Sequence, residues 1–159
     1  MRCDAHTFAQ MYEAVYIDLY RFALCLMKNK QDAEDAVSEA VLKAFENIRK
    51  LRDENAFKSW IFTITANICK SRLREAAKKK NESIEKSLEN TPSEEVDYGM
   101  NIDVRRAFLV LTEEEQTIIG LSVFGGYNSK EIGRMLGLKD NTVRSKKVRA
   151  LEKMECVLK

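Results

Sequence analysis

Residues 128–154 read NSKEIGRMLGLKDNTVRSKKVRALEKM, and the spacing of their small and apolar residues is typical of a helix-turn-helix. Gly137 can take the left-handed conformation that ends a helix at a sharp turn. Gly133 presents a minimal side chain where two helices would cross, and Val143 adds a β-branched side chain that would seal the contact. The stretch therefore predicts two short helices packed against each other.

The first of these helices is predicted over 130–136 with Ser129 as its cap, and the second over 139–156. Residues 134–159 carry eight basic and three acidic side chains, most of the basic ones on the second helix. A generic helical hairpin explains the apolar spacing but not this concentration of positive charge, so we predict binding to the major groove of DNA. The polar and basic candidates on the second helix are Asn141, Thr142, Arg144, Ser145, Lys146, Lys147 and Arg149.

The helix-breaking residues are confined to the second half of the chain. All six glycines lie at or after Gly99, and the single proline is Pro92, so residues 1–91 contain neither. In a helix interior glycine costs about 1 kcal/mol and proline about 3 kcal/mol relative to alanine, whereas sheet proteins use both at their turns. The first half is therefore predicted to be helical throughout.

Apolar residues that recur every three or four positions divide this first half into three helices. The first helix is predicted to begin near Thr7, which has capping-box spacing with Gln10. The next two are predicted over 31–49 and 54–79. Each has one apolar face, which is enough for a small bundle, and the whole chain is predicted to be all-α.

The net charge of +2 conceals strongly charged segments. Residues 70–80 carry six basic side chains against one acidic, and residues 81–103 carry one basic side chain against seven acidic. The acidic segment is also rich in Ser and Asn and contains the proline, which is typical of a linker. We therefore predict a helical domain over 1–80, a linker over 81–101 and a smaller domain over 102–159.

The helix predicted over 31–49 has an acidic face opposite its alanines. This acidic ridge surrounds an exposed leucine and consists of Asp35, Ser38, Glu39, Leu42 and Glu46. A solvated helix face and a surface that binds another protein both explain the pattern.

The helix predicted over 54–79 runs from an aromatic cluster around Trp60 into the basic block of residues 70–80. Rings, amides and cations together suit melted nucleic acid, because bases stack on rings while phosphates follow positive charge. Trp60 by itself is better explained as a core residue. Asn67, an amide near the middle of the helix, favours a specific partner.

Several classes of protein are not expected from this sequence. No apolar run approaches the about 20 residues of a membrane span, and the N-terminus has no signal-peptide pattern, so a cytoplasmic protein is expected. The four cysteines are far apart with no CxxC pair, and the one histidine is His6, so neither a metal site nor a cofactor is expected. The chain has no phosphate-binding glycine loop and no nucleophile–base pair, so it is not expected to be an enzyme.

Three segments resemble the extracytoplasmic-function (ECF) sigma factors, the two-domain form of the sigma-70 family. DAEDAVSEAVLKAF (32–45) and FKSWIFTITANICKSRLR (57–74) resemble the family's regions 2.1–2.2 and 2.3–2.4, and LTEEEQTIIGLSVFGGYNSKEIGRMLGLKDNTVRSKKVRAL (111–151) resembles its region 4. The resemblance implies an RNA polymerase sigma factor that binds core polymerase and directs promoter recognition, DNA melting and transcription initiation. It also adds an anti-sigma factor as a partner.

The resemblance assigns roles to the N-terminal residues. Core polymerase would use the clamp helices of its β′ subunit, and contacts from its β subunit are expected as well. The family's core-binding positions match Asp35, Ser38, Glu39 and Leu42. The loop over 49–56 corresponds to the one that receives a base flipped from the melted minus-10 strand. Candidates for contacts to that single strand are Lys43, Leu51, Lys58, Asn67 and Arg74.

In the C-terminal part, the resemblance adds Val148 to the residues expected to meet the duplex minus-35 element. Arg144, Ser145 and Arg149 match the other positions that face bases, while Lys146 and Lys147 are expected on phosphates. Four residues depart from the family pattern, so the promoter sequence does not carry over from relatives: Ser38 replaces a glutamine, Lys70 an aspartate, Leu51 an aromatic residue and Lys147 an apolar one.

Two other functions fit the residues alone. A stand-alone helix-turn-helix regulator would bind a palindromic site as a dimer through its N-terminal bundle. A helical adaptor between proteins would use its basic segments only for solubility. Association with core polymerase distinguishes the sigma factor from both.

Overall fold

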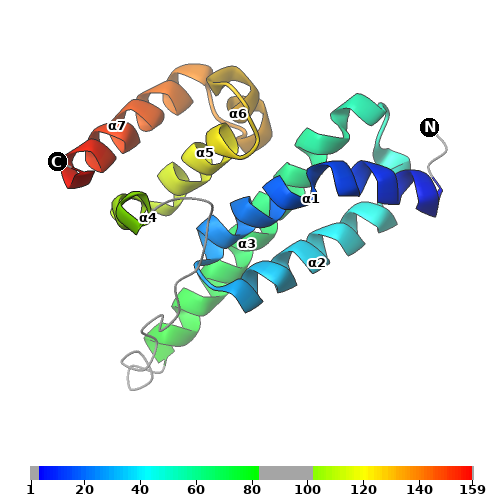
Figure 1. The fold of residues 1–159 in the computed structure, drawn as a ribbon, viewed down its shortest axis with the longest axis horizontal. Helices are drawn as coiled ribbons and strands as arrows, with labels where there is room; N and C mark the ends of the chain where they lie inside the picture. The colour runs from blue at the N-terminus through cyan, green and yellow to red at the C-terminus, as the bar shows by residue number, and fades with distance from the viewer. Residues whose placement is uncertain (1–3, 83–101, 159) are drawn as a thin grey trace.

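The computed structural model describes residues 4–82 and 102–158, and all regular secondary structure in these two ranges is helical. This confirms the predicted all-α class. The N-terminal half contains α1 (Ala5–Met27), α2 (Lys30–Glu46), the 3₁₀ turns η1 (Ile48–Lys50) and η2 (Glu54–Ala56), and α3 (Phe57–Glu82). The C-terminal half contains α4 (Ile102–Phe108), α5 (Glu113–Val123), α6 (Ser129–Leu136) and α7 (Asp140–Leu158). Figure 1 shows the two halves side by side.

The three long N-terminal helices form the predicted bundle. Its interior holds Leu19 and Phe22 of α1, the alanines of α2, and Ile61 and Phe62 of α3, all fully or almost fully buried. The small alanines allow α2 to approach its neighbours closely. The last turns of α3 are exposed and extend past the rest of the bundle (Figure 1).

Several helix ends differ from the predicted ones by a few residues. Asp4 caps α1 by accepting a hydrogen bond from the Thr7 backbone N–H at 2.8 Å, so Thr7 is not the cap. Asn128 rather than Ser129 caps α6, and it forms a capping box with Glu131. In each case the residue with extended backbone just before the helix makes the cap, and neighbouring polar residues compete for that place.

The helix-turn-helix of α6 and α7 confirms the prediction. Gly137 has a φ of +71°, in the left-handed region. A Cβ atom at Gly133 would lie 2.7 Å from the Leu138 carbonyl oxygen, so only glycine fits without movement. Val143 is fully buried at the contact of the two helices.

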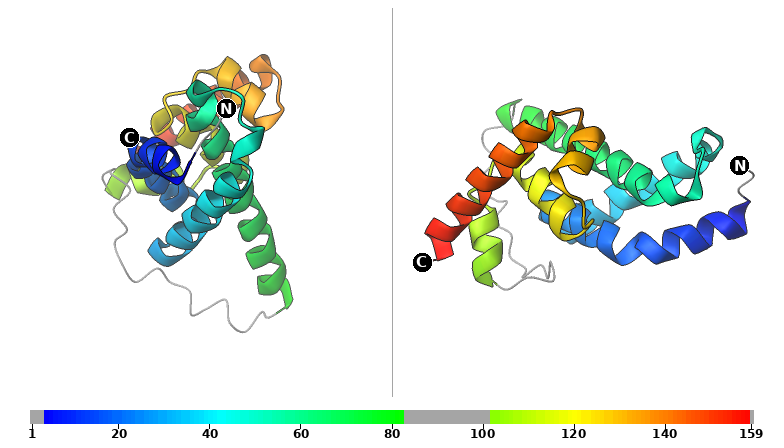
Figure 2. Two further views of the ribbon diagram at one scale, coloured as in Figure 1. Left: turned by 90° about the vertical axis from the view of Figure 1, so that its right-hand side faces the viewer. Right: turned by 90° about the horizontal axis from the view of Figure 1, so that it is seen from above.

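The two halves pack against each other, which the sequence did not predict. Helix α5 contacts α1, and α5 and α6 contact α3. Ile118 and Leu121 of α5 belong to the same apolar cluster as the N-terminal core. Figure 2 shows the C-terminal helices at one end of the N-terminal bundle, far from the start of α1. The predicted linker over 81–101 lies outside the described residues, except that Asn81 and Glu82 belong to α3.

Candidate nucleic-acid interface

The exposed face of α7 gathers most of the predicted duplex-reading side chains. One open depression of about 470 Å³ is lined by Asn141, Arg144, Ser145, Val148, Arg149 and Glu152. On the opposite face of the helix, Val143 and Ala150 are fully buried and fix its orientation. The structure thus brings five of the eight predicted residues onto one surface. The other three, Thr142, Lys146 and Lys147, are half-buried beside it.

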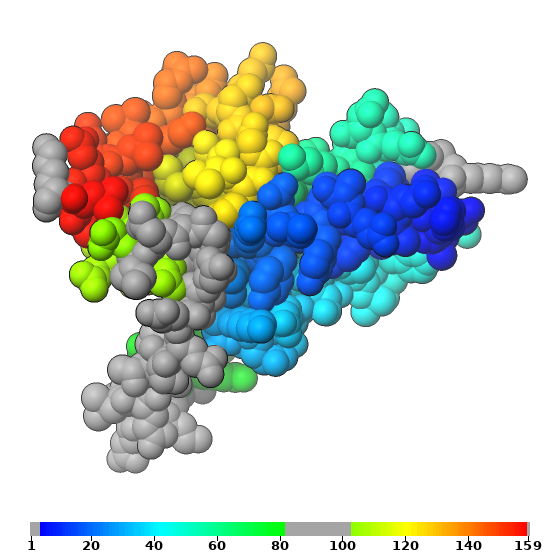
Figure 3. Space-filling model, in the orientation of Figure 1, coloured from blue at the N-terminus to red at the C-terminus, as the bar shows by residue number. Residues whose placement is uncertain are grey.

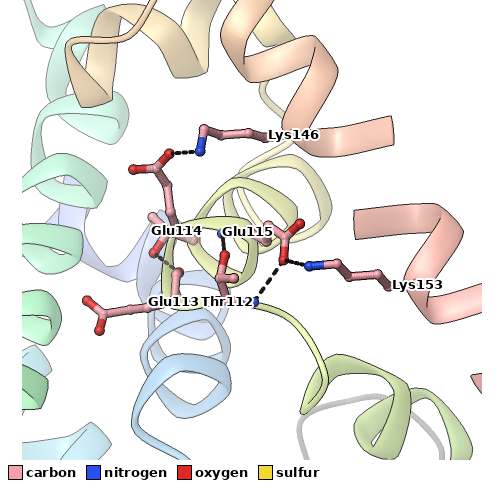
Figure 4. Close-up of polar contacts among 7 residues, drawn as sticks. Thr112, Glu113, Glu114, Glu115, Lys146 and Lys153 are labelled. Atoms are coloured by element: carbon pink, nitrogen blue, oxygen red, sulfur yellow. Dashed lines mark hydrogen bonds and ion pairs between the residues drawn. The ribbon is translucent and has the colours of Figure 1, made fainter. Parts of the chain in front are cut away.

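Two cations of α7 are held by carboxylates in different ways. The Arg144 guanidinium lies 3.2 Å from Asp140 one helical turn earlier, and its side chain is 63% exposed. An exposed pair of this kind contributes at most about 1 kcal/mol, so Arg144 can readily exchange Asp140 for another partner. Lys146 lies 2.7 Å from Glu114 of α5 and therefore joins the two helices (Figure 4).

The start of α5 fixes the position of α7. Thr112 and Glu115 form a capping box, and the Glu115 carboxylate also accepts a hydrogen bond from Lys153 at 2.8 Å (Figure 4). Burial would raise the pKa of this carboxyl, but the hydrogen bonds from Lys153 and Thr112 together hold the pKa below its usual value. Glu115 is therefore ionised, and its carboxylate links the start of α5 to Lys153 of α7.

The residues of α3 that are predicted to contact the melted DNA strand face the C-terminal half. The Lys58 ammonium donates to the Gly125 carbonyl oxygen at 3.0 Å and lies 5.6 Å above the Tyr127 ring. Farther along the helix, one wall of a cleft of about 320 Å³ is formed by α3 and the other by the C-terminal half. The polar residues that line this α3–α5 cleft are Asn67, Lys70 and Arg74 on α3 with Glu113, Glu114 and Thr117 on α5.

The other two minus-10 candidates are not in the α3–α5 cleft. Lys43 is exposed on α2. Leu51 is only 5% exposed, because this apolar side chain anchors the loop between η1 and η2 to the bundle core. In this conformation it presents no surface to a DNA strand. Trp60 is half-buried and its ring packs against Phe57, in agreement with a core role.

The acidic ridge of α2 is exposed along its length. Asp35, Ser38, Glu39 and Leu42 all face solvent, and Leu42 is 60% exposed. Glu39 forms an ion pair of 2.8 Å with Arg72, which joins the ridge to α3. Phe45 was not predicted as part of this surface, although it lies three residues after Leu42 and so extends the same apolar patch. It is 44% exposed, and its ring packs edge-on against Phe8.

The described residues contain no group of three His, Cys, Asp or Glu side chains that could hold a metal ion. Cys25 and Cys69 are buried, and burial raises the pKa of each thiol to about 12. Both thiols are therefore protonated and unreactive at neutral pH in this conformation. No helix in the described part of the chain has the length and apolar character needed to span a membrane.

Comparison with protein families gives two matches that together cover most of the chain. Residues 11–79 match Sigma-70 region 2, and residues 102–154 match Sigma-70, region 4. The chain is similar to RNA polymerase sigma factor SigV of Bacillus subtilis strain 168, with 30% identity over 89% of this chain and 84% of that protein. It is also similar to ECF RNA polymerase sigma factor SigM of Mycobacterium tuberculosis strain H37Rv, with 28% identity over 98% of this chain and 79% of that protein.

Two solved structures share the fold. One is the sigma factor RpoE in complex with the anti-sigma factor NepR from Bartonella quintana, with a TM-score of 0.82 and 24% identity over 95% of this chain and 96% of that chain. The other is CnrH in complex with the cytosolic domain of CnrY, with a TM-score of 0.66 and 20% identity over 98% of this chain and 89% of that chain. The arrangement of helices is thus one that the sigma factor RpoE also adopts.

Proposed function

Because the chain belongs to the ECF sigma factors of the sigma-70 family, we propose that it binds core RNA polymerase, directs it to promoters and helps to melt the DNA there. The chain supplies recognition rather than catalysis, since the surfaces described above bind and position. It acts in the cytoplasm, where bacterial polymerase works. Three separate surfaces of the chain carry out these steps.

The exposed face of α7 reads duplex DNA at the minus-35 element. Arg144 and Arg149 can each donate two hydrogen bonds to a guanine edge in the major groove. Val148 is 52% exposed and can contact the methyl group of a thymine. Lys146 and Lys147, beside this face, neutralise phosphates and fix the position of the helix. This exposed face, held outward by Val143 and Ala150, is the observation that carries the proposal.

The α3 surface captures the melted minus-10 strand. Lys58 and Arg74 attract its phosphates, and the exposed Asn67 amide can hydrogen-bond the edge of an unstacked base. Extruding a base from the duplex costs a few kcal/mol, and contacts to the extruded base offset part of that cost. Recognition and strand opening therefore depend on the same residues.

The acidic ridge of α2 binds the clamp helices of the polymerase β′ subunit. Leu42 and Phe45 form an apolar centre, and Asp35 and Glu39 add negative charge beside it. A desolvated apolar centre with charges at its rim is the usual form of an energetic hot spot in protein interfaces. The matching partner surface is basic with an apolar centre.

Run-off transcription with purified core polymerase tests the proposal, together with a pull-down of the core enzyme. Arg144→Ala and Arg149→Ala should each reduce the use of promoters that carry the preferred base at the contacted position and leave core binding intact. Glu39→Arg should weaken core binding strongly but preserve the weak binding of the free protein to DNA. Failure of the wild type to bind core polymerase or to support initiation at any promoter would contradict the function. Equal loss of both activities in every variant would contradict the assignment of surfaces.

An anti-sigma factor is a further proposed partner. The sigma factor RpoE from Bartonella quintana, whose fold this chain shares, was solved in complex with the anti-sigma factor NepR. Co-purification of the chain from its native cells, followed by mass spectrometry of the bound proteins, tests this part of the proposal. Recovery of core polymerase alone would count against it.

A further inference from the structure

The first two turns of α7 carry an acid and a base on the same exposed side of the helix. Asp140 lies one helical turn before Arg144, and its Oδ2 atom accepts a hydrogen bond from Nη2 of Arg144 at 3.2 Å. The side chain of Asp140 is 42% exposed and that of Arg144 is 63% exposed. Figure 3 shows α7 (orange to red) at the outer surface of the C-terminal half, so a ligand can reach both charges from outside.

The backbone of Asp140 and one oxygen of its carboxylate are held by the protein. A Cβ atom at Gly133 of α6 would lie 3.6 Å from the Asp140 backbone nitrogen, so α6 and α7 cross closely at this point. The Oδ1 atom is buried and has no hydrogen-bond partner within residues 4–82 and 102–158. Because protein encloses one oxygen and Arg144 meets the other, the carboxylate has a defined orientation.

The ion pair leaves Arg144 able to read a base. A guanidinium has five N–H donors in one plane, and Asp140 accepts from only one of them. A guanine edge in the major groove accepts two hydrogen bonds from an arginine, at O6 and N7. Arg144 can therefore contact a guanine and Asp140 at the same time.

A phosphate is a poorer partner for Arg144 while Asp140 is beside it. Like charges repel, so the carboxylate disfavours a phosphate at the same guanidinium, whereas a guanine edge is uncharged. An exposed arginine also loses conformational freedom when it binds, and a side chain that a neighbour already orders has less freedom to lose. Asp140 thus favours contact with a base over contact with a phosphate in two ways.

From this geometry we infer that Asp140 is a positioning residue for base reading: it holds Arg144 toward the base edges and away from the phosphates, and so determines how strongly the chain prefers guanine at the position that Arg144 contacts. The inference rests on the proposed role of the exposed face of α7. A negative charge in the first turn of a helix also stabilises that helix. Stabilisation alone would change the binding of all sequences equally, so base preference separates the two roles.

Selection of DNA by the holoenzyme tests the inference. Core polymerase with the wild-type or a variant chain binds a library of random duplexes, and sequencing of the bound fragments gives the base preference at each promoter position. Arg144→Ala identifies the position that Arg144 reads, because the preference there should fall by roughly 5- to 150-fold. Competition between the selected duplex and its single-base variants then gives each protein's preference as a ratio of affinities.

Asp140→Ala should lower this preference roughly two- to fivefold, the range expected for loss of an exposed ion pair. Asp140→Asn should do the same, since it keeps the size of the side chain and removes its charge. Asp140→Glu keeps a carboxylate one turn before Arg144 and should retain most of the preference.

Glu152→Ala is the matched control. Glu152 is an exposed acid of the same helix and lines the same depression as Arg144. Its loss changes the charge of α7 as much as Asp140→Ala does, so both variants should bind unrelated duplexes slightly more tightly than the wild type. Only Asp140→Ala should lower the preference at the position that Arg144 reads.

Asp140→Ala should add nothing in the Arg144→Ala background, because Asp140 acts through that arginine. A further loss of preference in the double variant would show that Asp140 contacts DNA itself and would overturn the inference. An unchanged preference in Asp140→Ala, or an equal loss in Glu152→Ala, would overturn it as well. Circular dichroism monitors folding, and if Asp140→Ala loses helical signal, Asp140→Asn decides.

Failure of the proposed function gives a different result. If the preference at no promoter position depends on Arg144, the exposed face of α7 does not read bases as proposed, and the inference is wrong with it. If such a position is found and Asp140→Ala leaves its preference unchanged, the proposed function stands and only the inference is wrong.

Discussion

Arg144 and Lys146 of α7 are two residues apart and yet have different surroundings. Arg144 is mostly exposed and pairs with Asp140 of its own helix, whereas Lys146 is half-buried and pairs with Glu114 of a neighbouring helix. The planar guanidinium can match the two acceptors of a guanine edge, and the lysine acts as a point charge. We therefore expect Arg144 to determine sequence preference and Lys146 to contribute general affinity.

Substitution of these two residues should separate the two roles. Arg144→Ala should cost about 1–3 kcal/mol on promoters with the preferred base at its position and little on others. Lys146→Ala should weaken binding similarly on all sequences and lower the salt slope by about one. Transcription from a panel of single-base promoter variants, with a salt titration of holoenzyme binding, measures both effects. A uniform loss for Arg144→Ala would contradict its role in base reading.

Glu39 belongs to the acidic ridge and also pairs with Arg72 of α3. Glu39→Arg should reduce core binding at least about tenfold, because it reverses a charge on the proposed core-binding surface and places the new charge beside Arg72. Arg72→Ala is the control: it breaks the same ion pair but keeps the ridge acidic, and an exposed pair costs at most about 1 kcal/mol of stability. Core affinity by biolayer interferometry compares them. Equal loss in both variants would show that the ion pair, rather than the charge of the ridge, determines binding.

At the scale of elements, the crossing of α6 and α7 depends on close backbone contact at Gly133. Gly133→Ala places a Cβ atom against the Leu138 carbonyl, which belongs to the backbone and moves only if the turn moves. We expect a lower thermal midpoint and loss of DNA binding. Arg134→Ala, at an exposed position of the same helix, should change neither by much. Thermal unfolding followed by circular dichroism checks this, and equal midpoints for both variants would contradict the close contact.

The Glu115 anchor predicts a dependence of stability on pH. Its folded-state pKa lies below the ordinary value of 4.5, so its contribution is present above that value and is lost as the pH falls through the folded pKa. Glu115→Gln should therefore lower the free energy of unfolding at neutral pH, and the difference from wild type should shrink as the pH falls below 4.5. Urea unfolding of both proteins at neutral pH and at a series of lower pH values measures this. A difference independent of pH would mean that the charge of Glu115 does not contribute.

The three N-terminal helices were predictable because their apolar stripes have the period of a helix and residues 1–91 contain neither glycine nor proline. The turn between α6 and α7 was predictable because three of its positions restrict the residue type. Gly137 needs a left-handed backbone, Gly133 needs a minimal side chain, and Val143 needs an apolar side chain of the right size. The cap of α6 was misplaced by one residue because Asn128 and Ser129 both cap helices well. The burial of Leu51 could not be predicted, because one apolar residue in a loop can lie in a core or contact a ligand.

The contact between the two halves could not be predicted from the sequence, for a different reason. Phe22, Ile118 and Leu121 have the spacing of ordinary core residues, and periodicity does not tell which helix lies opposite. The same is true of Arg72 and Glu39, which are 33 residues apart in sequence. Only Phe45 carried a signal that could have been used, since it lies one helical turn from the exposed Leu42.

At the scale of the whole molecule, the two halves share one apolar cluster. Such a shared core predicts that the protein unfolds in a single cooperative transition, with equal calorimetric and van't Hoff enthalpies. Gly120→Ala should lower the midpoint of this transition, because its Cβ atom would push against the buried Phe22 ring of the N-terminal core. Differential scanning calorimetry measures both. Two transitions in the wild type would contradict a common core.

The distribution of charge over the whole molecule affects how strongly the free protein binds DNA. A net charge of +2 combines the basic side chains of α3 and α7 with acidic side chains that are concentrated in residues 81–103. The free protein should therefore have only weak general affinity for DNA. Binding to polymerase holds both basic surfaces against the same promoter. Two weak contacts on one scaffold act together through a high effective concentration.

Cys25 of α1 is 1% exposed because it packs among residues of the C-terminal half, including Phe108 and Ile119. Part of its cover is thus supplied by the other half of the molecule. In this conformation the thiol stays protonated and protected from oxidants. The chemical lifetime of a cysteine in the first helix therefore depends on how well the C-terminal half is packed against it.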